Sequence, residues 1–205
     1  MTDLSSATST KYALLRLIKL QTEIYLMTTL NTATASVFVT TYGVGNEQGF
    51  ATGKWFDLTD FDDKDEFIDA ATEYAQEVLG DDDPELCFAD FEAGFNTRNL
   101  ISECSISDQV WEILTLNAHE MKLLFIYAEW QGERITDAHD MLERAQGLYA
   151  GQWDSEEDYA SDRLSETGYL ENLPDIIRYN LDMEGIADWF MQDMYHEDGY
   201  FFFNS

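Results

Sequence analysis

Residues 148–166, LYAGQWDSEEDYASDRLSE, hold six acidic side chains and one basic side chain, Arg163. Two pairs in this stretch have the spacing of a helix capping box: Asp154 with Glu157, and Ser155 with Asp158. Either pair predicts that a helix begins here, and the helix dipole favours acids in its first turn. Taken alone, this pattern is typical of a well-capped surface helix.

Two other segments are also rich in acids, and in each the pattern predicts a helix with an acidic face and an apolar face. Residues 62–79 predict a helix that ends at Gly80, and residues 133–146 predict another. In both, the acids and the apolar residues have helical spacing and fall on separate faces. The acidic faces comprise Asp62, Glu66, Asp69, Glu73 and Glu77 in the first helix, and Glu133, Asp137 and Asp140 in the second. The apolar face of the first comprises Phe67, Ala71, Tyr74 and Val78.

The charge of the chain is far from zero. Its 205 residues include 41 acids and 11 lysines and arginines, a net charge of −30. Residues 36–205 hold 39 of the acids and 8 of the bases, and no more than ten residues separate successive acids between Glu47 and Asp198. With 45% hydrophobic residues the chain has enough apolar side chains to fold. Such a polyanion repels nucleic acid, so a protein that grips nucleic acid is the more natural partner.

The residue patterns predict both strands and helices. The predicted strands are residues 36–42, 50–58, 87–91 and 200–203. The first two are expected to pair through a hairpin loop at residues 43–49, whose glycines lack the spacing of a phosphate-binding loop. Besides the helices above, helices are predicted at residues 107–129, 173–180 and 182–195. The first of these is long and apolar enough to belong to the core or to a subunit interface.

Nothing in the sequence predicts catalysis, a cofactor or a metal site. His119, His139 and His196 have no cysteine or histidine partner at metal-ligand spacing. Cys87 and Cys104 do not form a Cys-x-x-Cys pair and are interpreted as reduced thiols. Charged residues interrupt the apolar residues 12–27, so no membrane span is expected and a cytoplasmic protein is predicted. Residues 1–35 are interpreted as a flexible or amphipathic N-terminal extension.

The dispersed charge suggests an imitation of DNA. Duplex DNA carries one negative charge per about 1.7 Å of axis. Residues 36–205 carry a net charge of −31, from 39 acids and 8 bases, which corresponds to roughly 50 Å of duplex. We expect the acidic faces above to form this surface together with Asp154, Glu156, Glu157, Asp158 and Asp162. The main alternative is an acidic, halophile-type domain whose acids serve solvation. A second, a calcium-dependent structural or adhesion module, would need clustered Asp loops that the sequence lacks. On the mimicry hypothesis, single Asp or Glu to Ala changes should do little, because exposed charges act collectively.

Several motifs, taken in order, resemble those of the ArdA antirestriction family, DNA mimics carried by plasmids and conjugative elements. They are residues 55–59 (WFDLT), 61–67 (FDDKDEF), 83–86 (DPEL), 88–92 (FADFE), 101–103 (ISE) and 149–159 (YAGQWDSEEDY). The last resembles the family's antirestriction motif. It comprises Tyr149, Gly151, Trp153, Asp154, Ser155, Glu156, Glu157, Asp158 and Tyr159.

The resemblance implies an elongated fold of the α+β class, with several small α/β subdomains in a row and a highly acidic surface. The expected divisions are residues 1–35, 36–92, 93–147 and 148–205. It further implies a homodimer that does not bind nucleic acid directly. This dimer would occupy the DNA groove of type I restriction-modification enzymes, at their methyltransferase core. It would thereby block restriction, and often modification, while a conjugative plasmid or transposon enters a new host.

Overall fold

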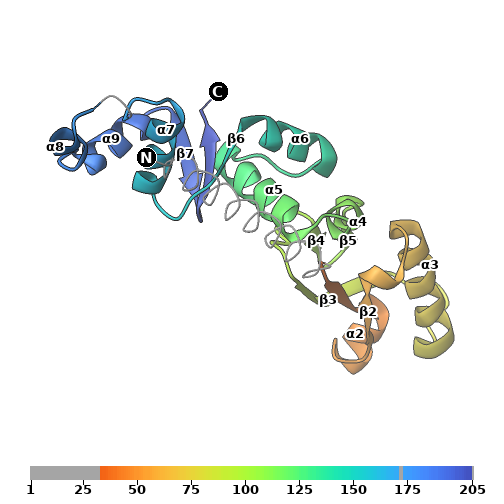
Figure 1. Ribbon diagram of the computed structural model, residues 1–205. Coiled ribbons are helices and arrows are strands. Elements are labelled where there is room, and N and C mark those ends of the chain that lie inside the picture. Colours follow the sequence, from red (N-terminus) through yellow and green to blue (C-terminus); the bar gives the residue numbers. More distant parts are fainter. Residues whose placement is uncertain (1–32, 171–172, 205) are drawn as a thin grey trace, which may run out of the picture. The chain divides into compact units, whose positions relative to one another are not determined.

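The computed structural model describes residues 33–170 and 173–204 of the chain (Figure 1). The predicted extension, residues 1–35, lies almost entirely outside them. Contacts divide the chain into two compact units, Met1–His139 and Asp140–Ser205. Helices and small antiparallel sheets occur in both, which confirms the predicted α+β class. The finer division into subdomains remains a prediction.

A three-stranded antiparallel sheet opens the N-terminal unit, in the order β2-β1-β3. Its strands are β1 (Ala35–Thr41), β2 (Lys54–Asp57) and β3 (Leu86–Ala93). The β-branched residues of β1 favour the strand, and its Val37 and Val39 are fully buried in the core. All three strands were predicted, although β2 is shorter than residues 50–58.

The loop predicted at residues 43–49 is wrong, because all of it but Gly49 belongs to a helix, α2 (Tyr42–Gln48), although β1 and β2 pair antiparallel as predicted. Thr41 supplies the reason: its Oγ1 atom accepts a hydrogen bond from Val44 N at 3.1 Å and so caps the helix. The same hydroxyl donates to Asp81 Oδ2 at 2.6 Å, which ties the helix start to a distant loop. The ring of Phe50 packs so closely against Gly45 that a Cβ atom built on Gly45 would lie 2.5 Å from Phe50 Cε1.

The acidic helix predicted at residues 62–79 consists of two parts. A short 3-10 turn, η1 (Leu58–Asp60), leads into α3 (Lys64–Tyr74), and α3 continues as a π-helical turn, η2 (Ala75–Leu79), that ends at left-handed Gly80. Phe67 and Ala71 are buried as predicted, but Val78 is 67% exposed. A π turn closes its hydrogen bonds over one more residue than an α turn, so the inward position moves from Val78 to Leu79.

The predicted helix at residues 107–129 is two helices, α4 (Gln109–Leu114) and α5 (Ala118–Gln131), which follow a small hairpin of β4 (Ile101–Ser102) and β5 (Ser105–Ile106). Asn117 causes the break because it caps α5. Its side chain accepts from Glu120 N at 3.0 Å, and Glu120 Oε2 accepts from Asn117 N at 3.0 Å. The core of this unit includes a cluster of rings from Phe56, Phe67 and Trp111.

The C-terminal unit surrounds a second antiparallel sheet, in the order β6-β8-β7. Its strands are β6 (Tyr149–Gln152), β7 (Met194–Glu197) and β8 (Tyr200–Phe203), so the predicted terminal strand is the central one. Three helices accompany the sheet: α7 (Glu156–Glu166), α8 (Asp175–Arg178) and α9 (Met183–Met191). Figure 1 shows α7 and α9 beside one another, and Tyr159, Met194 and Phe201 form the core of the unit.

Several helix boundaries in this part of the chain differ from the prediction, and α8 is shorter than the predicted residues 173–180. Helix α6 (Ala138–Leu148) begins five residues later than expected, and α9 ends before Met194, which lies in β7 instead. None of the helices in the described ranges is long and apolar enough to cross a membrane.

Candidate acidic binding surface

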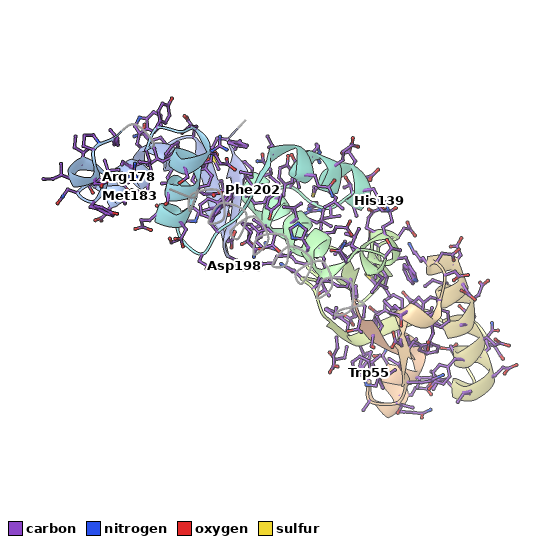
Figure 2. All side chains as sticks on the ribbon, in the orientation of Figure 1. Trp55, His139, Arg178, Met183, Asp198 and Phe202 are labelled. Atoms are coloured by element: carbon purple, nitrogen blue, oxygen red, sulfur yellow. The ribbon has the colours of Figure 1, made fainter. Side chains whose placement is uncertain are left out.

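The acids of the chain lie at its surface. Within residues 33–170 and 173–204, no aspartate or glutamate side chain is buried. Figure 2 shows the side chains of both units standing out from the ribbon. Because each unit carries many acids and few bases, each presents a negative surface.

The five predicted acids of the α3 region are all exposed, but they do not form one uniform stripe. Asp62 precedes the helix, and Asp63 is the capping residue: its Oδ1 atom accepts from Glu66 N at 2.9 Å. Glu66 folds back to accept from Asp62 N at 2.7 Å. Glu77 belongs to the π turn, so the single helical spacing predicted for the whole set is wrong at both ends.

The second predicted acidic face is wrong as a helix face. Glu133 and Asp137 precede α6, and of the three predicted acids only Asp140 lies on it. All three are exposed. Arg144, four residues after Asp140, lies 3.1 Å from the Asp140 carboxylate and partly neutralises it.

The antirestriction-type motif divides into a solvent half and a packed half. In the solvent half, Ser155 is the capping residue of α7, because its hydroxyl accepts from Asp158 N at 3.1 Å. The structure therefore selects the Ser155 pair from the two that the sequence offered. Asp154, Glu157 and Asp158 are exposed at the start of the helix, where its dipole favours negative charge.

Aromatic rings make up the packed half. Trp153 meets Tyr159 edge to face at 4.8 Å and Phe201 at 5.4 Å. Tyr159 is buried, and it stacks on Phe201 at 5.4 Å. Tyr149 packs against Phe202 of β8 at 5.8 Å. These contacts hold the acidic helix against the sheet, so the aromatic residues of the motif support the acids rather than join them at the surface.

Two acids of this region are held by other side chains. Asp162 Oδ2 accepts a hydrogen bond from Trp153 Nε1 at 3.3 Å. Glu156 Oε1 lies 2.7 Å from His196 Nε2, and the imidazole stacks on Phe201 at 5.1 Å. His196 was not predicted to have this role, and no sequence signal could have found it, since it lies forty residues from Glu156. Glu156 and Asp162 are half-buried, and we assign them to the support of the surface.

Burial acts on several groups that can ionise. It raises the pKa of Tyr149 to about 12, with a further contribution from Tyr200, and it raises the pKa of Tyr159. Burial, followed by the charge of Glu103, also raises the pKa of the Cys87 thiol. Cys87 is buried, Cys104 is exposed, and neither is in a disulfide. The described residues contain no group of three or more acids, histidines and cysteines that could hold a metal ion.

The comparison with family models matches residues 37–202 to the family described as antirestriction protein (ArdA). The comparisons with curated proteins and with solved structures give no match. The matched range takes in the sheets of both units and the motif around α7. Proteins of this family are inhibitors rather than enzymes, and their partners are restriction-modification enzymes. The chain belongs to the ArdA family of antirestriction proteins.

Proposed function

We propose that this antirestriction protein is a DNA mimic that occupies the DNA-binding groove of type I restriction-modification enzymes. The observation that carries the proposal is the exposure of the acids: none in the described residues is buried, and they recur along both units. An acidic protein with an ordinary surface would intersperse bases among them, but residues 36–205 hold only 8 bases against 39 acids.

The spacing of the acids supports mimicry in physical terms. On α3, Asp69 and Glu73 are four residues apart, so their side chains are neighbours at about 5–6 Å. Duplex DNA has one charge per about 1.7 Å of axis over both strands, and one phosphate per about 3.4 Å along each strand. A groove lined by lysine and arginine would meet a comparable density of negative charge on this surface, and salt would screen the attraction.

The finer features of the proposal rest on the resemblance to the family. The protein acts as a homodimer, does not bind nucleic acid itself, and binds the methyltransferase core of the enzyme. By excluding DNA from the groove it blocks restriction, and modification with it. Such an inhibitor protects a conjugative plasmid or transposon that enters a new host.

Competition for DNA tests the proposal. The purified full chain is mixed with a type I methyltransferase core and a labelled duplex that contains its target, at low and at moderate salt. We expect displacement of the duplex at near-stoichiometric amounts, weaker as salt rises. Polyglutamate of matched total charge is the control, because it reports the displacement that any polyanion produces.

Two results would contradict mimicry. The first is a lack of displacement at low salt by a chain that is folded under the same conditions. The second is displacement no better than that by polyglutamate. If folding also required high salt, the halophile-type alternative would be favoured, because acids that serve solvation need salt to relieve their mutual repulsion.

A further inference from the structure

A surface hollow of about 480 Å³ lies between strand β2 and the acidic helix of the N-terminal unit. Its lining includes Lys54 and Phe56 from β2, Asp60 from η1, Tyr74 from α3 and Glu77 from η2. Phe61, which follows η1, also lines it. Trp55 of β2, labelled in Figure 2, is a further lining residue.

The hollow combines aromatic rings with carboxylates. Phe56 packs against Tyr74 edge to face at 5.6 Å and against Phe61 at 6.2 Å, so the rings form one connected surface. Glu73 and Glu77 line the same hollow, and both are exposed. This composition differs from that of the remaining acidic surface, where acids stand in open solvent.

The chain already places a cation at these rings. The Lys54 ammonium lies 4.6 Å from the centre of the Phe56 ring and 5.9 Å from that of Tyr74. Both distances are within the range of a cation–π interaction. The rings are therefore oriented to receive positive charge, and Glu73 and Glu77 provide carboxylates beside them.

We propose that this hollow receives an arginine side chain from the DNA-binding groove of the restriction-modification enzyme. The inference rests on the proposed function, because such grooves bind phosphates through basic side chains. Arginine fits the hollow better than lysine does. Its flat guanidinium stacks on aromatic rings, and its fork of N–H donors pairs with a carboxylate through two hydrogen bonds. Contact with rings also removes water, which strengthens the ion pair.

The hollow is thus a local exception to collective binding. An exposed ion pair contributes about 0.2–1 kcal/mol, so most single acids add little. Residues that fill a desolvated pocket contribute far more to an interface than those at its open rim. We expect the acids of the hollow to matter more than equal charges a few residues away.

A pair of double variants of the full chain tests the proposal by competition for DNA. The first, Glu73→Gln with Glu77→Gln, removes the two glutamate carboxylates of the hollow and leaves those of Asp57 and Asp60. The second, Asp65→Asn with Asp69→Asn, removes two charges with the same four-residue spacing from the same helix but outside the hollow. We expect the first to weaken binding about 10- to 30-fold and the second about 2- to 5-fold. Thermal melts of both variants report whether they fold.

A second pair of variants is expected to bind the enzyme more tightly rather than more weakly. Lys54→Gln removes the cation that the hollow already holds, and Lys64→Gln removes a charge that pairs with Asp108 at 3.5 Å outside it. Each change makes the protein more negative by one charge. We expect Lys54→Gln to tighten binding about two- to fivefold more than Lys64→Gln does, because it also removes the competitor of the incoming guanidinium.

The outcomes separate this inference from the proposed function. If the unmodified chain does not displace DNA, the proposed function fails. If it displaces DNA but the two double variants lose equal affinity and the two lysine variants gain equally, the hollow has no special role. Only the inference on the hollow is then overturned, and collective charge accounts for the binding.

Discussion

Gly151 and Trp153 lie so close that a Cβ atom built on Gly151 would fall 2.5 Å from Trp153 Cη2. The backbone of Gly151 also has a φ of 141°, which residues other than glycine rarely adopt. The glycine of the motif is therefore required by the aromatic packing that supports α7. Gly151 thus allows Trp153 to pack against Tyr159 of α7, the helix that carries the acids.

Gly151→Ala should destabilise the C-terminal unit by about 2–4 kcal/mol, the sum of backbone strain and overpacking. Urea unfolding followed by tryptophan fluorescence measures it. Gly147→Ala is the matched control, because nothing lies within 4 Å of a Cβ atom there and the residue is within α6. It should be neutral or stabilising by up to about 1 kcal/mol. Equal effects of the two changes would show that the contact with Trp153 is not what requires the glycine.

Ser155→Ala should cost about 1 kcal/mol of stability, because it removes the acceptor of the Asp158 N–H bond that starts α7. Ser161→Ala, an exposed position within the same helix, should cost nothing, since alanine is the better helix former. Chemical unfolding of both variants provides the measurement. A Ser155 variant as stable as the unmodified chain would mean that another residue, such as Asp154, takes over the cap.

Local signals in the sequence predicted strands β1, β2, β3 and β8, whereas strands β4 to β7 were not predicted. They also predicted that α3 and α6 are acidic helices, although only Asp140 of the second acidic face lies on α6. Strand β1 shows β-branched composition, and the end of η2 is marked by Gly80, which adopts the left-handed conformation that a helix stop requires. The break before α5 also had a signal, since Asn117 and Glu120 have capping-box spacing. Only the apolar continuity of residues 107–129 concealed it.

Tertiary contacts decided what local signals could not. The start of helix α2 has a local cap at Thr41, but the same hydroxyl also bonds to Asp81, a residue forty positions away. The π turn that exposes Val78 has no local signature. The same limit applies to the candidate site. The acids could be predicted from composition, but the pairing of Glu156 with His196 depends on the fold.

The stability of the protein should fall at alkaline pH through Tyr149. Its pKa is raised from 10.0 to about 12 by burial, so the folded state favours the protonated phenol. The stabilisation is fully present below pH 10.0 and is lost as the pH rises toward about 12, because the unfolded chain then ionises first. Tyr149→Phe should lose less stability over this range, and Tyr179→Phe, at an 81% exposed position, should behave as the unmodified chain does. Unfolding free energies measured along this pH range test it, and identical pH profiles for all three proteins would contradict it.

The acids at the start of α7 should act collectively in binding a restriction-modification enzyme. Glu157 is exposed, and an exposed charge contributes about 0.2–1 kcal/mol, so Glu157→Gln alone should weaken binding less than about fivefold. Neutralising Asp154, Glu157 and Asp158 together should weaken it by more than any one change, with a shallower dependence on salt, because fewer charges then attract the groove. Displacement of labelled DNA from the enzyme at several salt concentrations measures both effects, and melting curves exclude a loss of folding. A tenfold loss from Glu157→Gln alone would contradict collective action, since it would identify that carboxylate as a specific contact in a desolvated site.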